Sequence, residues 1–148
     1  MRGRIWLSAI IILLLALIGC GAPPQTAKVI RVIDGDTIVI EGNYRVRYIG
    51  IDTPEIRPVP EAYGLEAWQA NRELVEGKEV RLERDVSETD KYGRLLRYVY
   101  VDDILVNAEL VRRGLAEARA YPPDTKYQDY LEKLEKEARA AGRGMWAK

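Results

Sequence analysis

Two short acidic segments carry the side chains with the clearest chemical potential. Asp36 ends the run Asp34-Gly-Asp36, and Asp52-Thr-Pro-Glu55 follows the arginine Arg47. Carboxylate oxygens suit a hard cation such as Ca²⁺ or Mg²⁺, and Glu55 could serve as a general base. The planar guanidinium of an arginine can donate two parallel hydrogen bonds to a phosphate. Together these are the parts needed for metal-assisted attack of water on a phosphodiester.

Each segment also has a plainer structural interpretation. Asp-Gly-Asp is typical of a turn. Asp52 or Thr53 could cap a helix that has Glu55 in its first turn, and an arginine in a strand is commonly a solvated surface residue. The chemical interpretation rests on the co-occurrence of both segments with a third, Asp90-Lys-Tyr-Gly-Arg94, which supplies a second arginine.

The supply of metal-binding and basic side chains narrows the chemistry further. The chain has no histidine and one cysteine, which excludes histidine zinc sites, a histidine base and a Ser-His-Asp triad. The base must then be a carboxylate, a lysine, a tyrosine or metal-bound water. A donor set made only of oxygens suits Ca²⁺ better than Zn²⁺.

The elements that must position these residues are strands first and helices mostly later. Five segments with alternating or β-branched character predict strands over 28–33, 36–40, 44–51, 79–84 and 95–101, with a hairpin signal at 41–43. Helices are predicted over 63–76, 108–113 and 125–141, and Asn107 is the expected N-cap of the second. This pattern predicts an α+β fold, a five-stranded OB-type Greek-key β-barrel with three α-helices.

Composition agrees with one globular domain. The 148 residues are 47% hydrophobic and 31% charged, which suits a packed core rather than a disordered chain. The formal net charge is zero, so the chain lacks the excess of basic residues that is usual in proteins that bind long duplexes. Recognition of a phosphate by a local pair of arginines remains compatible with that balance.

The N-terminus is predicted to be a targeting segment. Arg2 and Arg4 precede an uncharged apolar run from Ile5 to Ile18, shorter than the roughly 17–25 residues of a membrane span and suited to a signal peptide. The run ends at Leu-Ile-Gly-Cys20, which resembles the lipobox of prokaryotic lipoproteins. We therefore expect a signal peptide over 1–19, a lipidated Cys20 with a tether over 20–27, and a domain over 28–148. An ordinary signal peptide or an uncleaved anchor are the alternatives.

Four segments, in order between Lys28 and Trp146, carry a family resemblance. They are Val32-Ile-Asp-Gly-Asp-Thr37, Val46-Arg-Tyr-Ile-Gly-Ile-Asp-Thr-Pro-Glu55, Thr89-Asp-Lys-Tyr-Gly-Arg94 and Val106-Asn-Ala-Glu-Leu-Val-Arg-Arg-Gly-Leu-Ala116. This combination resembles the staphylococcal-type thermonuclease family, which has the same OB-type fold.

The resemblance implies a role for each residue of the catalytic centre. Asp36 and Asp52, with the backbone carbonyl of Thr53, would hold Ca²⁺. Glu55 would act as the base or orient the attacking water. Two arginines, Arg47 and Arg94, would bind the scissile phosphate. Cleavage of the 5′ P–O bond, leaving 3′-phosphate ends, is also what the resemblance implies.

The resemblance further implies a substrate-binding set. Lys91 and Tyr92 match positions that contact the terminal phosphate of the nucleotide, although Lys-Tyr-Gly is also a plausible tight turn. Tyr121 falls where the family places aromatic residues against the base, with a core or loop-anchoring tyrosine as the alternative. The loop over 56–62 departs from the family because it is shorter, poorer in lysine and stiffened by Pro58 and Pro60.

The expected function is therefore that of a Ca²⁺-dependent nuclease acting on single-stranded or frayed DNA and RNA. We expect a monomer, exported and held through its N-terminal lipid at the outer face of the cell membrane, or secreted if the lipobox is not used. A noncatalytic OB-type binding module is the first alternative, because this fold can keep binding and lose chemistry. A structural lipoprotein with a coincidental match is the second.

Overall fold

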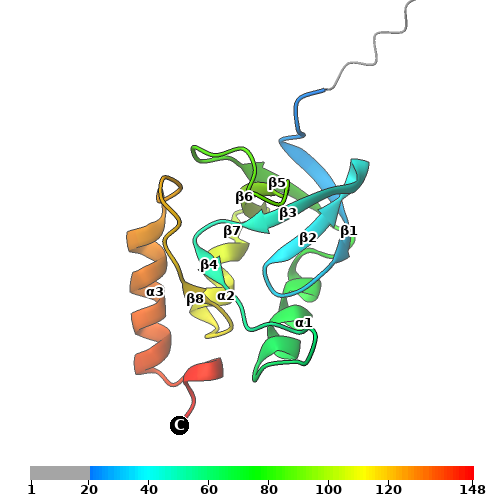
Figure 1. The fold of residues 1–148 in the computed structure, drawn as a ribbon. Helices are drawn as coiled ribbons and strands as arrows, with labels where there is room; N and C mark the ends of the chain where they lie inside the picture. The colour runs from blue at the N-terminus through cyan, green and yellow to red at the C-terminus, as the bar shows by residue number, and fades with distance from the viewer. Residues whose placement is uncertain (1–20) are drawn as a thin grey trace, which may run out of the picture.

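A closed β-barrel forms the body of the protein (Figure 1). The computed structural model describes residues 21–148, so the predicted signal segment and Cys20 lie outside the described residues. The barrel strands are β1 (Thr26–Val32), β2 (Thr37–Ile40), β3 (Tyr44–Tyr48), β5 (Glu79–Glu83) and β6 (Leu95–Val101). They pair in the order β3-β2-β1-β5-β6, and a parallel pairing of β3 with β6 closes the barrel. The predicted five-stranded barrel is confirmed.

The barrel interior follows the apolar pattern of its strands. Ala27 and Val29 alternate with exposed neighbours in β1, whereas all four residues of β2 are buried. A short strand, β7 (Ile104–Leu105), extends the sheet beside β6. Strand β1 begins at Thr26, two residues before the predicted start of the domain.

Three helices surround the barrel, as predicted. They are α1 (Gly64–Val75), α2 (Val106–Arg112) and α3 (Gln128–Ala140), and two 3₁₀ turns cover Glu41–Asn43 and Gly144–Trp146. The inward face of α3 consists of Leu131, Leu134 and Ala138, at the helical spacing expected from the sequence. No helix within residues 21–148 has the length and apolarity needed to cross a membrane.

The single strand predicted over 44–51 is wrong, because the structure divides this segment into two strands. The segment over 44–51 does not run straight, because Gly50 adopts φ 77° and breaks it after β3. A Cβ atom at this position would lie 2.6 Å from Leu131 Cδ1, so glycine is also needed for close packing. The chain resumes as β4 (Ile51–Asp52), which pairs with β8 (Glu117–Ala118). This pairing carries Asp52 to residues 117–119.

The predicted N-cap role of Asn107 is also wrong. Helix α2 begins at Val106, two residues before its predicted start, and Leu105 stands at its N-cap position without a capping side chain. Asn107 is instead fully buried, where its Oδ1 accepts from the Val99 amide at 2.9 Å and its Nδ2 donates to the Ile49 carbonyl at 2.8 Å. Buried backbone groups at the β3–β4 break need such partners, and the side chain of Asn107 supplies them.

Candidate active site

The turn between β1 and β2 places Asp36 at the centre of the site. Asp34 Oδ1 accepts a hydrogen bond from the Asp36 amide at 3.0 Å, so the side chain of Asp34 stabilises the turn. Gly35 lies against Thr53, whose Oγ1 would be 2.7 Å from an added Cβ. Only glycine therefore allows this turn to approach the β4 segment so closely.

Asp36 is a buried and well-held carboxylate. Its residue is 5% exposed, its Oδ2 accepts from the Thr53 amide at 2.9 Å, and its Oδ1 accepts from the Thr37 hydroxyl at 3.1 Å. Burial raises the pKa of Asp36 to about 6, while the positive charge of Arg47 opposes that rise. A buried carboxylate of this kind gains from a nearby cation.

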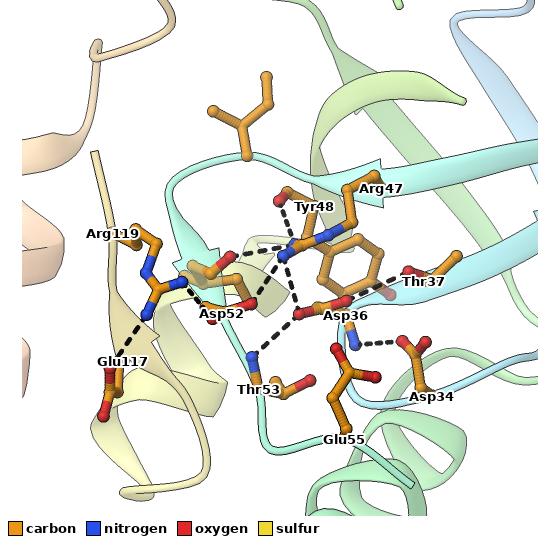
Figure 2. Close-up of polar contacts among 12 residues, drawn as sticks. Asp34, Asp36, Thr37, Arg47, Tyr48, Asp52, Thr53, Glu55, Glu117 and Arg119 are labelled. Carbon is orange, nitrogen blue, oxygen red and sulfur yellow. Dashed lines mark hydrogen bonds and ion pairs between the residues drawn. The ribbon is translucent and has the colours of Figure 1, made fainter. Parts of the chain in front are cut away.

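Arg47 joins the two acidic segments (Figure 2). Its Nη2 lies 3.1 Å from Asp36 Oδ2 and 3.1 Å from Asp52 Oδ1. Its Nη1 donates to the carbonyls of Tyr48 at 2.9 Å and Ile51 at 3.0 Å. The guanidinium is thus fixed across the β3–β4 break, and the carboxylates of Asp36 and Asp52 converge on one point.

The donor set around that point fits a hard cation. Asp36 and Asp52 offer two carboxylates, and the chain at Thr53 is bonded to Asp36 through its amide. Among residues 21–148, no group of three or more acidic, histidine or cysteine side chains is arranged to hold a metal ion. Two carboxylates and one backbone carbonyl would be few protein ligands, all of them oxygen, and would leave positions for water and substrate, as Ca²⁺ and Mg²⁺ tolerate and structural Zn²⁺ does not.

Glu55 faces this centre from the segment after β4 (Figure 2). Its pKa is raised by partial burial first, then by the negative charges of Asp36, Asp52 and Glu61, while Arg47 opposes the rise. Its backbone is held by Glu61, whose side chain accepts from the Glu55 amide at 2.9 Å and whose amide donates to the Glu55 carbonyl at 2.8 Å. Glu61 belongs to none of the motifs identified in the sequence, so its contact with Glu55 was not predicted.

The remaining predicted residues gather in one cavity of about 260 Å³, which we call the nucleotide pocket. Its walls include Arg47, Lys91, Tyr92, Arg94 and Tyr121. Tyr121 is 43% exposed, which fits a pocket wall better than a core residue. The structure thus brings the second arginine and all three predicted substrate-binding residues beside Arg47.

Asp90 shapes the turn that carries Arg94. Its Oδ1 accepts from the amides of Tyr92 at 2.9 Å and Arg94 at 3.0 Å, and its Oδ2 accepts from Arg94 Nε at 2.7 Å. Burial raises the pKa of Asp90, but these hydrogen bonds outweigh it and leave the pKa below its usual value. Asp90 therefore orients Arg94, and the tight turn predicted at Lys91-Tyr92-Gly93 is confirmed.

Arg119 is a site residue that sequence reasoning missed. Its Nη1 lies 2.7 Å from Asp52 Oδ2, and its Nη2 lies 3.7 Å from Glu117. The side chain is 51% exposed. Only the β4–β8 pairing places it there, because nothing in the local sequence at Arg119 points to Asp52.

Two further residues that sequence reasoning missed, Tyr48 and Asn71, hold the β1–β2 turn in place through hydrogen bonds. The buried Tyr48 hydroxyl donates to Asn71 Oδ1 at 2.8 Å, and Asn71 Nδ2 donates to the Asp34 carbonyl at 3.0 Å. Burial raises the pKa of Tyr48, so the phenol stays neutral and remains a donor. The available signal was Asn71, a polar residue among the apolar positions of the predicted helix.

Comparisons with known proteins agree with this geometry. Residues 45–148 match the family described as staphylococcal nuclease homologue. The thermonuclease of Staphylococcus hyicus is 42% identical over 132 residues, which cover 85% of this chain and 78% of that protein. The thermonuclease of Staphylococcus intermedius is 43% identical over 122 residues, with 78% and 73% covered. Endonuclease YncB of Bacillus subtilis is 43% identical over 126 residues, with 80% and 60% covered. The chain therefore belongs to the staphylococcal nuclease family, a family of phosphodiester-hydrolysing enzymes.

Proposed function

We propose that this protein is a Ca²⁺-dependent nuclease that hydrolyses single-stranded or frayed DNA and RNA and leaves 3′-phosphate ends. One observation carries the proposal: Asp36 and Asp52 meet at a single guanidinium nitrogen of Arg47, with Glu55 facing them. Arg47 and Arg94, the two arginines expected to bind a phosphate, both line the adjoining nucleotide pocket.

The cation site would consist of Asp36, Asp52 and the backbone carbonyl of Thr53. When bound there, Ca²⁺ would polarise a phosphoryl oxygen and offset its negative charge. The exclusively oxygen donors and the small number of protein ligands support this choice of metal.

Glu55 would take the proton from the attacking water. A pKa above the usual glutamate value brings this group closer to neutral pH, where a general base is more effective. As water adds to phosphorus, charge would grow on the phosphoryl oxygens. The bond to the 5′ oxygen would then break, and that oxygen would leave as an alcohol after taking a proton from solvent. The guanidinium groups of Arg47 and Arg94 would stabilise that charge more strongly in the transition state than in the substrate.

The nucleotide pocket would hold the nucleotide next to the scissile bond. Tyr121 and Tyr92 offer exposed rings for base or sugar contact, and stacking on an aromatic ring accepts any base. Lys91, whose Nζ lies 5.0 Å from the centre of the Tyr92 ring, would meet a further phosphate.

The decisive experiment is digestion of single-stranded DNA with and without Ca²⁺, followed by analysis of the product ends. We expect cleavage only with the metal and 3′-phosphate products. Glu55→Gln should lower kcat by roughly a hundredfold or more, the usual contribution of a general base. Glu79→Gln, an exposed acid on β5, is the matched control. Undiminished cleavage in EDTA would disprove the metal site, and undiminished cleavage by Glu55→Gln would disprove the base. Binding without any cleavage would favour the noncatalytic alternative.

We also propose that the protein acts as a monomer, exported and anchored by lipid at the outer face of the cell membrane. Support comes from the sequence alone, in the charged start, the apolar run and the single cysteine at Cys20. A free thiol is otherwise unusual in an exported protein. The domain begins at Thr26, so only a short tether would separate it from the lipid.

A further inference from the structure

A second hollow, of about 520 Å³, lies between the barrel and α1 and shares no residue with the nucleotide pocket. We call it the arginine groove. Its walls include four arginines from four different segments, together with one indole and one aliphatic side chain: Arg31, Arg45, Arg57, Arg72, Trp68 and Ile56.

The charge of the arginine groove is largely uncompensated. Arg72 pairs with Glu76 at 2.8 Å, and Glu76 is the only acid among the described residues that lines the groove. Among residues 21–148, no side chain forms an ion pair or hydrogen bond with the guanidinium of Arg31, Arg45 or Arg57. All three are exposed. Three local positive charges stand out in a chain whose formal net charge is zero.

Strand register places these arginines in line with the catalytic centre. Arg31 pairs with Val39, and Val39 pairs with Arg45, so the two arginines project from the same face of the sheet. Arg45 and Arg47 are two residues apart in β3, which puts them on one face about 6.7 Å apart along the strand. The groove therefore begins next to the arginine that contacts Asp36 and Asp52.

The two catalytic loops enter the groove directly. Ile33, a wall residue, immediately precedes Asp34 of the β1–β2 turn, and Ile56 and Arg57 immediately follow Glu55. A strand leaving the catalytic centre on the side of Glu55 would thus meet the groove at once.

Trp68 gives the groove an aromatic wall. Its Nε1 donates to the Val32 carbonyl at 3.3 Å, and the Arg72 guanidinium lies 4.8 Å from the ring centre. These contacts fix the indole between the arginines. Grooves that bind single strands combine positive charge along the backbone with aromatic side chains, and this groove has both.

We propose that the arginine groove binds the sugar–phosphate backbone of a single-stranded substrate on the side of the scissile phosphate opposite the nucleotide pocket. The proposal rests on the proposed function, because that function places the scissile phosphate at Arg47. It adds a subsite of several nucleotides and predicts a preference for substrates long enough to reach it.

The test compares two triple variants of the full-length protein in nonionic detergent. One carries Arg31→Gln, Arg45→Gln and Arg57→Gln. The control carries Lys133→Gln, Lys136→Gln and Lys148→Gln. These replace three exposed lysines, two on α3 and one at the C-terminus, and remove the same charge outside the groove. Both are made with Glu55→Gln, and binding of a 12-nucleotide single strand is measured in EDTA by fluorescence anisotropy at several salt concentrations.

The groove variant should bind the strand about ten- to a hundredfold more weakly, and its salt slope should fall by about 2, as expected for three lost phosphate contacts. The control should keep the affinity and slope of the parent. An equal change in both triple variants would overturn the proposal. Because binding is measured without metal and without cleavage, this result stands apart from success or failure of the proposed catalysis.

A second measurement separates a strand-binding role from damage to the catalytic centre. With Glu55 intact, the groove variant should cleave a dinucleotide at the parental rate and show a raised KM only for the 12-nucleotide strand. Equal loss on both substrates would mean that the arginines support the centre itself, and it would overturn the groove assignment.

Discussion

At the scale of single residues, Arg47 has the most constrained environment in the site. One guanidinium contacts two carboxylates and two backbone carbonyls. A lysine ammonium is a point charge without the planar fork that these four acceptors need. The positive charge alone therefore does not explain why an arginine, and not a lysine, occupies this position.

Arg47→Lys should lower kcat by about a hundredfold, the usual loss for one transition-state donor, although the charge is kept. Arg139→Lys, at an exposed position of α3 where the arginine pairs with Glu135, is the control and should retain its rate. Steady-state kinetics on single-stranded DNA measures both. A near-normal rate for Arg47→Lys would mean that Arg47 serves only the fold.

Arg119 makes a second residue-scale prediction. Its guanidinium lies 2.7 Å from Asp52 Oδ2, so it competes with a divalent cation for that carboxylate. Because half of the side chain is exposed and the pair is screened by solvent, the effect should be small.

Arg119→Gln should raise Ca²⁺ affinity by about two- to fivefold, the size expected for an exposed ion pair. Titration calorimetry with Ca²⁺ measures it, and Arg112→Gln, whose partner Glu109 is remote from the site, is the control. A fall in affinity would show that Arg119 orients Asp52 for the cation instead of competing with it.

At the scale of elements, the site depends on the break between β3 and β4. The chain turns at Gly50, and β4 then pairs with β8. At the break, the side chain of Asn107 in α2 donates a hydrogen bond to the Ile49 carbonyl. The same amide bonds to Val99 in β6. One buried side chain therefore ties a helix, a barrel strand and the segment that carries Asp52.

Asn107→Ala should destabilise the protein by roughly 2–4 kcal/mol, because it leaves two buried backbone groups without partners. Urea unfolding followed by circular dichroism measures the change. Gln69→Ala, at an exposed position of α1, should stay within about 0.5 kcal/mol of the parent. If both variants unfolded at the same urea concentration, Asn107 would have no such role.

At the scale of the whole molecule, function depends on where the domain is held. No helix among residues 21–148 is long and apolar enough to span a membrane, and the proposed anchor is the lipid on Cys20. If Cys20 carries lipid, the domain is tethered by its N-terminal strand, and the site remains free for strands arriving from outside.

Cys20→Ser should move the protein from the membrane fraction to the soluble or secreted fraction, because the hydroxyl cannot take the thioether-linked lipid. Fractionation of expressing cells with immunoblotting measures this, and Ser8→Ala within the apolar run is the control. Unchanged membrane association of Cys20→Ser would favour an uncleaved anchor.

The nuclease family and the class of fold could both be predicted from the sequence. Candidate metal and phosphate ligands were recognisable because Asp36, Asp52, Glu55 and Arg94 stand in short motifs whose spacing is local. The barrel strands and the three helices followed from apolar periodicity, which also is local. The absence of histidine excluded several mechanisms without any structure.

The distant residues that contact these motifs could not be predicted from the sequence. Arg119 reaches Asp52 through the register of β4 and β8, and Asn107 reaches Ile49 through packing of α2. The arginine groove likewise assembles from β1, β3, the loop after β4 and α1. Such contacts depend on strand register and helix packing, which bring together positions far apart in the chain and leave no periodic signal at either end.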